Sequence, residues 1–390
     1  DGNLPINLVT NYQMPAPASS QALLQTRSAM YFPRENLAMG MGMVYGLTGV
    51  SGDIIALGQG IHADFAYDGQ TIYHEMGHLM NRALSNLKYT ITLDSYGMNA
   101  LENALEQGLA ETMTFLVSDR SGMFRYIDRL EGPGFFRDAD NDLSYPADYC
   151  GKDQADAMIL AGAMWEVYGA LQSEGVTTPQ FTRLLLLSMQ TLDANTAELS
   201  FADWADAFLA DMEMEGRAAQ KTAVAAIFEK RGLFISERVR PLPANSAGIV
   251  LYIGGAYKAM WNTVLTLDLD TGDLPVSTAL VQLKAGPFDH DTACTLSAKP
   301  NALSGRESMY PSVDDWDLRL FARSAEPIRY ETVSSWRARV AYDTQIEALT
   351  DGTGSVSFPL TFSAGKALYL HLVNAGDSPI FLTSIRLTCP

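Results

Sequence analysis

Apolar residues recur three and four positions apart through much of the first 234 residues, which is the spacing of one face of an α-helix. This pattern predicts helices over residues 68–84, 99–116 and 153–171, and two more that begin near Thr178 and Ser200. The N-terminal part of the chain is therefore predicted to be mainly helical.

The residues before the first long helix give a different pattern. Residues 20–30 predict one short helix, and the glycine-punctuated run from Ala38 predicts extended segments, of which 53–57 is the best strand. A strand in this place has two interpretations. It is either an edge that pairs with a bound peptide or an ordinary strand of the sheet.

Beyond residue 247, apolar and polar residues alternate with the period of a β-strand. The alternation occurs in segments 248–255, 262–269, 277–283, 316–322, 337–343, 355–362, 367–373 and 380–387. Short turns separate these segments, which favours a β-sandwich. The stretch RVRPLPANSA at 238–247 predicts a linker. The chain is thus expected to be an α+β protein, with a mainly helical domain at 1–237 and a β-sandwich at 238–390.

Composition and charge narrow the class of protein. The 390 residues are 47% hydrophobic and 18% charged, as in a soluble globular protein. A net charge of -18 argues against binding to nucleic acids and to anionic lipid surfaces. No stretch approaches the 18 or so apolar residues that a membrane span needs.

The predicted helix at 68–84 contains His74, Glu75 and His78 in the order H-E-x-x-H. Residues four apart lie on one face of a helix, so both imidazoles can bind one Zn²⁺ ion, and Glu75 can act as the general base for a water. A random chain of this composition would contain the pattern with a probability of roughly 0.004. This low probability favours a metal site over a chance match.

Cysteine usage bears on localisation. Of Cys150, Cys294 and Cys389, the last two flank much of the β-rich region, and a disulfide between them would imply an oxidising compartment. The alternative is three buried thiols.

The sequence around the motif, FAYDGQTIYHEMGHLMNRAL at 65–84, resembles the gluzincin metallopeptidases, and within them the fungalysin-like group, which show FAxDxxVIxHEYGHxxxNRL. The phrase IFEKRGLF at 227–234 resembles the family's AFxxRGLG, so the resemblance extends over about 53–234. It implies a zincin-like catalytic domain with a small sheet. It also implies a secreted zinc endopeptidase that acts on protein or peptide substrates.

Family members carry a third zinc ligand, a Glu, in the phrase N-E-G-x-A-[DE]. Here the matching phrase is EQGLAE at 106–111, with Gln107 at the ligand position. The neighbouring Glu106 is the preferred third ligand, which requires a helical irregularity to turn it inward. Gln107, Glu102 and Glu111 remain alternatives, and Glu111 matches the family's acid that supports a zinc histidine.

Two further positions are candidates. The family often has a His that stabilises the transition-state oxyanion, and the corresponding position here is about Gln154, with Asp156 close by. Asp138, Asp140 and Asp142 alternate like the start of a Ca²⁺ loop, but Leu143 replaces the required Gly, so a solvated acidic turn is favoured. His290 and His371 are expected to be surface or core residues.

The sequence supports two functions. One is a secreted zinc endopeptidase with His74, His78 and Glu106 as ligands and Glu75 as base. The other is a weak or inactive peptidase-like protein that binds partners through its β-sandwich. Gln107 and the missing oxyanion His favour the second function, and the intact Glu75 favours the first.

Overall fold

The computed structural model of the chain describes most of the sequence. The described stretches are residues 6–15, 23–25, 28–34, 52–85, 87, 92–132, 135–192, 199–253, 282–301, 318–324, 326–329, 349–350, 356–374 and 380–390. The chain is a mixed α+β protein with several small sheets, as predicted at this level.

The chain divides into two compact units. The first unit consists of Asp1–Tyr89, Glu102–Leu143 and Ala157–Phe234, and the second of Thr90–Leu101, Ser144–Asp156 and Ile235–Pro390. Two short segments from inside the predicted domain 1–237 therefore belong to the second unit.

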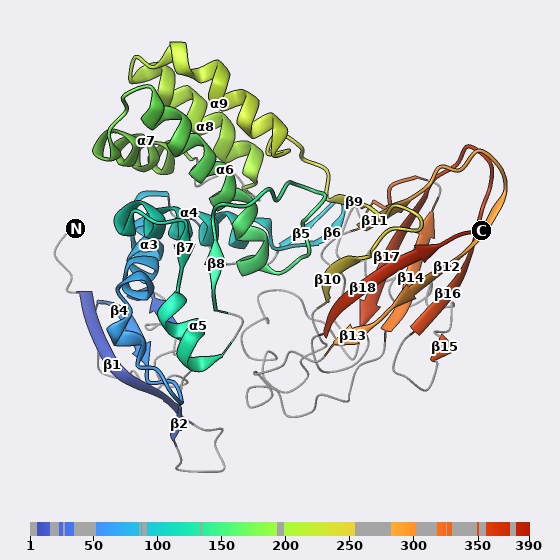
Figure 1. The fold of residues 1–390 in the computed structure, drawn as a ribbon, viewed down its shortest axis with the longest axis horizontal. Coiled ribbons are helices and arrows are strands. Elements are labelled where there is room, and N and C mark those ends of the chain that lie inside the picture. The colour runs from blue at the N-terminus through green and yellow to red at the C-terminus, as the bar shows by residue number, and fades with distance from the viewer. Residues whose placement is uncertain are drawn as a thin grey trace. The chain divides into compact units, whose positions relative to one another are not determined.

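The first unit contains a four-stranded sheet with the order β2-β1-β4-β3 (Figure 1). Its strands are β1 (Ile6–Pro15), β2 (Leu23–Gln25), β3 (Ala29–Phe32) and β4 (Asp53–Gly58), and a separate ribbon pairs β7 (Gly122–Met123) with β8 (Arg137–Asp138). β4 runs parallel to β1 and antiparallel to β3, and five of its six residues are buried. The predicted strand at 53–57 is confirmed.

The short helix predicted at 20–30 is wrong, because β2 and the first half of β3 lie there. β3 pairs with β4, and the Phe32 ring packs edge-on against Tyr12 with 6.3 Å between ring centroids. Pairing of β2 with β1 and of β3 with β4 outweighs the helix propensity of the Ala and Leu residues in this stretch.

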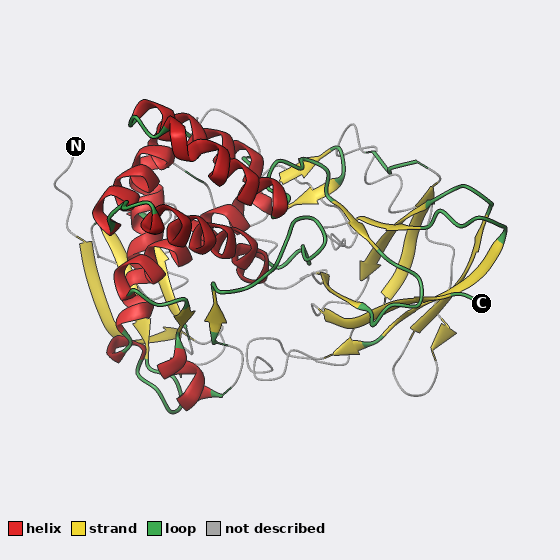
Figure 2. Cartoon of the chain, turned by 45° about the horizontal axis from the view of Figure 1, so that its top comes forward, coloured by secondary structure: helices red, strands yellow, loops and turns green. Residues whose placement is uncertain are grey.

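The long helices, red in Figure 2, begin and end close to their predicted positions as their bounds give them. The helices are η2 (Phe65–Tyr67, a 3₁₀-helix), α3 (Gly69–Ser85), α4 (Leu101–Ser118), α5 (Arg125–Glu131), α6 (Asp153–Ser173), α7 (Thr178–Thr191), α8 (Phe201–Met214) and α9 (Ala218–Lys230). Capping boxes begin α7 and α8, and α3 contacts β3 and β4. None of the helices in the described stretches has the length and apolar character that a membrane crossing needs.

Close packing of α3 on α4 depends on Gly77. A Cβ atom at this position would lie 2.7 Å from the Cα of Ala110, closer than folded proteins allow. Gly77→Ala is therefore expected to force the helices apart and to lower the free energy of unfolding by about 1–3 kcal/mol, measured in urea. Gly69→Ala is the matched control, because its nearest neighbouring atoms lie 3.7 Å away. Equal stability of Gly77→Ala and wild type would contradict the expectation.

The second unit contains two larger sheets and a hairpin. One sheet has the order β10-β18-β12-β16-β15 with β13 paired to β18, the other has the order β14-β17-β11-β9, and β5 pairs with β6. The strands are β5 (Thr92–Asp94), β6 (Gly97–Asn99), β9 (Val239–Pro241), β10 (Ile249–Ile253), β11 (Gln282–Ala285), β12 (Thr292–Ala298), β13 (Pro300–Asn301), β14 (Leu318–Ser324), β15 (Leu349–Thr350), β16 (Val356–Phe362), β17 (Leu368–Asn374) and β18 (Ile380–Thr388).

Most of the alternating segments form strands. β10, β14, β16, β17 and β18 confirm five of them, and β11 overlaps the end of the segment at 277–283. The segments at 262–269 and 337–343 lie outside the described residues. The sequence does not predict β12, because Thr, Cys and Ser in TACTLSA differ little in polarity from their neighbours Ala and Leu. The segment therefore shows no clear alternation of apolar and polar residues. Even so, the side chains of β12 alternate between buried and more exposed positions.

The predicted linker at 238–247 is wrong in its first part, because β9 lies there and pairs in parallel with β11. Arg238 is only 1% exposed and its guanidinium forms an ion pair with Asp94, while Nη1 of Arg240 donates to the carbonyl of Tyr149 at 3.1 Å. These contacts bury two charged side chains with partners and join three distant segments of the second unit.

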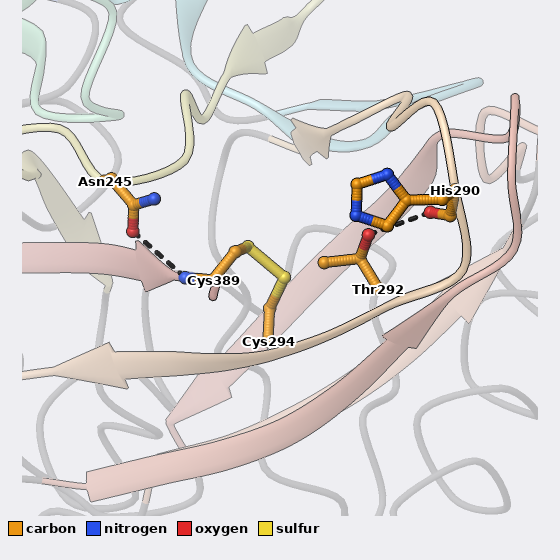
Figure 3. Close-up of a disulfide and its surroundings, with 5 residues drawn as sticks. All are labelled: Asn245, His290, Thr292, Cys294 and Cys389. Carbon is orange, nitrogen blue, oxygen red and sulfur yellow. Dashed lines mark hydrogen bonds between the residues drawn. A yellow bond between two sulfur atoms is a disulfide. The ribbon is translucent and has the colours of Figure 1, made fainter.

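The predicted disulfide between Cys294 and Cys389 is confirmed (Figure 3). It links β12 to the C-terminal end of the chain. The backbone N–H of Cys389 also donates to Oδ1 of Asn245 at 3.0 Å. Cys150 is a buried free thiol.

Asp156 is a buried carboxyl in the second unit. Burial raises its pKa to about 7, although the backbone N–H of Cys150 donates to it at 2.6 Å and opposes the shift. The folded chain therefore holds this proton more tightly than the unfolded chain does. Stability is expected to fall as pH rises from about 4 to about 7, by up to about 4 kcal/mol.

Urea unfolding of wild type and Asp156→Asn at pH 5 and pH 8 tests this expectation. The wild type should lose more stability than the variant between the two values, because the amide does not ionise. Asp140→Asn, an exposed position, is the control and should behave like wild type. An identical pH dependence in Asp156→Asn and wild type would contradict the assignment.

Candidate metal centre

The predicted metal-binding motif lies in the middle of α3. Oδ1 of Asp68 accepts from the backbone N–H of Gln70 at 3.2 Å, and Oδ2 accepts from the hydroxyl of Thr71 at 2.9 Å. Asp68 therefore caps the helix, as its sequence predicts. His74 and His78 follow one turn apart, and both side chains are buried.

The two imidazoles face each other through their Nε2 atoms, which are 3.0 Å apart. Two nitrogen ligands at about 2.0–2.1 Å from a tetrahedral zinc ion are about 3.3 Å apart. A small movement of the two rings away from each other would therefore make room for the ion between these two atoms.

Glu106 contacts the other side of His78. Its Oε1 lies 2.6 Å from Nδ1 of His78, and Asn81 donates to the same oxygen at 3.3 Å and to the Glu106 carbonyl at 2.7 Å. Glu106 thus lies beside Nδ1 and away from the two facing Nε2 atoms. α4 is α-helical from Leu101 to Ser118, without the irregularity that would turn Glu106 toward the Nε2 atoms, so Glu106 as the third ligand stays a prediction.

Gln107 lies on the Nε2 side. Its side-chain amide nitrogen is 3.4 Å from Nε2 of His78, and its Oε1 is buried without a hydrogen-bond partner among the described residues. A half-turn of the amide exchanges these two atoms and would bring the oxygen beside the imidazole nitrogens. Gln107 is therefore the side chain of α4 that can offer an oxygen to a cation held by the histidines.

Glu111 is close to His74. Its Oε1 is 3.6 Å from Nδ1 of His74 and forms an ion pair with Arg137. The Arg137 guanidinium lies over the Phe124 ring, whose edge contacts the His74 ring with 5.5 Å between centroids. The sequence pattern gives no signal for Arg137, because it reaches the site from a short strand 26 residues after Glu111.

Burial controls the electrostatics of the motif. Burial raises the pKa of Glu75 to about 7, and the nearby His78 opposes this shift. Burial, His78 and Arg137 lower the pKa of His74 well below its usual value. Burial also lowers the pKa of His78, but attraction to Glu106, the hydrogen bond to Glu106 and attraction to Glu75 together outweigh burial and raise the pKa overall. Glu75 is thus a buried carboxyl whose protonation changes near neutral pH.

The atoms around the two imidazoles indicate whether a cation could lie between them. Because Nδ1–H of His78 donates a hydrogen bond to Glu106, a neutral His78 has its lone pair at Nε2. A second lone pair from His74 would face it across 3.0 Å, which is favourable only when a cation or a proton lies between them. In the part of the chain that the structure describes, no three His, Cys, Asp or Glu side chains form a metal-binding group, so the third donor available here is the Gln107 amide. Two imidazole nitrogens and an amide oxygen would supply three donors to a tetrahedral ion, with a neutral amide in place of the carboxylate that is usual at catalytic zinc sites.

The other predicted residues occupy the following positions. Gln154 is half-buried at the second position of α6, in a segment of the second unit, and its role as an oxyanion donor stays a prediction. Glu102 is half-buried in the first turn of α4. His290 is exposed and His371 is buried, the two kinds of position expected for them.

The acidic run after β8 forms a turn. Oδ1 of Asp138 accepts from the backbone N–H of Asp140 at 3.1 Å, and Oδ1 of Asn141 accepts from the N–H of Leu143 at 3.0 Å. Both side chains therefore bind their own backbone, as in the solvated acidic turn that the sequence favours. A Ca²⁺ loop with Asp142 as a further ligand stays the alternative prediction.

Compared with known proteins, the chain matches no protein-family model and no curated protein.

Proposed function

We propose that the chain is a secreted zinc-dependent endopeptidase that hydrolyses peptide bonds in protein or peptide substrates. The observation that carries this proposal is the pair of buried imidazoles whose Nε2 atoms face each other at 3.0 Å on a helix that also contains Glu75. His74 and His78 would hold the ion. The contact of Glu106 with Nδ1 supports Gln107, rather than Glu106, as the third ligand.

The proposed chemistry needs a Lewis acid and a base. Bound zinc would polarise the substrate carbonyl and lower the pKa of water in the site. Glu75 would take a proton from that water and pass it to the leaving amine. Its raised pKa of about 7 supports this role, because a base works best when its pKa is near the working pH.

The proposal includes the fold and the compartment. We propose that the first unit is a zincin-like catalytic domain and that the second is a β-sandwich. The strand order of the two larger sheets and the alternating burial in β12 and β16 support the second assignment. The Cys294–Cys389 disulfide supports secretion, since disulfides persist mainly in oxidising compartments.

A second candidate function is that of a weak or inactive peptidase-like protein that binds a partner through its second unit. The position of Gln107 favours it, because a neutral amide is a weaker ligand than the carboxylate of an active enzyme. The two candidates differ in activity: the binding protein would retain zinc without hydrolysing casein.

Metal analysis tests the site itself. Protein purified without chelators and dialysed against Zn²⁺ is expected to retain one equivalent of zinc, and His78→Ala should lose most of it. His290→Ala, an exposed histidine, is the matched control and should retain the metal. Wild-type protein with well below one equivalent after this treatment would overturn the proposal.

A further inference from the structure

We infer that Glu106 is a positioning residue that supplies, through Nδ1 of His78, the negative charge that Gln107 does not bring to the metal. The inference rests on the proposed zinc site and concerns how this chain stabilises the ion with a neutral third ligand.

The contacts of Glu106 support this role. Its Oε1 is 2.6 Å from Nδ1 of His78, and both residues are buried, so little water screens the pair. Asn81 lies one turn after His78 on α3 and holds both the carboxylate and the carbonyl of Glu106. The carboxylate is therefore fixed in position by two side chains of the helix that carries the histidines.

A carboxylate in this position changes the imidazole. By accepting a hydrogen bond from Nδ1–H, the Glu106 carboxylate selects the tautomer with a lone pair at Nε2. The same hydrogen bond increases the electron density that Nε2 donates to a cation. The group formed by ion, imidazole and carboxylate then carries the same net charge as a site with a carboxylate ligand. The difference is that the carboxylate would act through the imidazole ring and would not bind the ion itself.

The two histidines are not equivalent in this respect. Nδ1 of His74 is 3.6 Å from Glu111, beyond hydrogen-bond distance, and Arg137 neutralises that carboxylate. His78 is therefore expected to be the stronger donor, and Glu106 the carboxylate on which zinc affinity depends.

Zinc affinity measured by competition with a chromophoric chelator tests the inference. Glu106→Gln can still accept the Nδ1 proton but carries no charge, and it is expected to weaken Zn²⁺ binding by about 10–100-fold. Glu106→Asp keeps the charge and should bind zinc more tightly than Glu106→Gln. The double variant Glu106→Gln/Gln107→Glu returns a carboxylate to the site and should recover most of the loss. Glu174→Gln, an exposed position, is the control and should match wild type.

The remaining outcomes separate the alternatives. If Glu106 were itself a ligand, Gln107→Ala would leave zinc affinity unchanged, whereas the inference expects it to fall. If Glu106 had only a structural role, Glu106→Gln would lower the urea unfolding midpoint without changing zinc affinity. Either result overturns the inference while the zinc site stands. A wild-type protein that binds no zinc overturns the proposed function and this inference with it.

Discussion

Replacing Glu75 by Gln is expected to reduce hydrolysis of casein by about 10²–10⁴-fold while the zinc content stays unchanged. Glu75 is buried beside His74, and its pKa of about 7 lets the carboxylate accept a proton near neutral pH. An amide has nearly the same shape but cannot accept that proton. The variant therefore removes the base and leaves the two imidazoles in place.

Casein hydrolysis and zinc content of the same samples measure the two effects separately. Glu213→Gln, on the exposed face of α8, controls for the loss of one carboxylate. Equal activity of wild type and Glu75→Gln would rule out the mechanism. Loss of zinc in Glu75→Gln would instead show that Glu75 is needed to form the site.

Removal of the Cys294–Cys389 disulfide is expected to lower the free energy of unfolding of the second unit by roughly 4 kcal/mol. The bridge joins residues 95 positions apart, and a cross-link over a loop of this length removes much of the conformational entropy of the unfolded chain. A loss of this size is a large part of the stability of a typical domain.

The measurement compares urea unfolding of wild type and of the Cys294→Ala/Cys389→Ala double variant, with and without a reducing agent. Reduction should move the wild-type midpoint close to that of the double variant and leave the double variant unchanged. Non-reducing peptide mapping that recovers both cysteines as free thiols from the wild type would reject the bridge.

The sequence predicts α3, the helix that contains the H-E-x-x-H motif, because the residues that determine it are neighbours in the chain. The cap at Asp68 and the apolar spacing along 68–84 lie within one segment, and the structure places α3 there. The sequence does not decide between Glu106 and Gln107, which are neighbours on one helix and point about 100° apart. In the fold Glu106 contacts Nδ1 of His78 and Gln107 lies near its Nε2, and this arrangement depends on the packing of α4 against α3, two helices that the local sequence does not join.

Long-range contacts also explain the error at 238–247. Proline and charged residues in RVRPLP are typical of an exposed linker, but Arg238 is buried because Asp94, 144 residues earlier, pairs with it. A single charged residue gives no sign of so distant a partner. Arg137 is another example, since only the folded chain brings it to Glu111.

The pairing of Asp94 with Arg238 has a consequence for synthesis of the chain on the ribosome. At about 5–20 residues per second, the 144 residues between them take about 7–29 seconds to be added. During that time the segment Thr90–Leu101 has been made, but Arg238, which pairs with its Asp94, has not. The helices of the first unit are made before then, so Asp94 gains its buried partner only after most of the first unit has been synthesised.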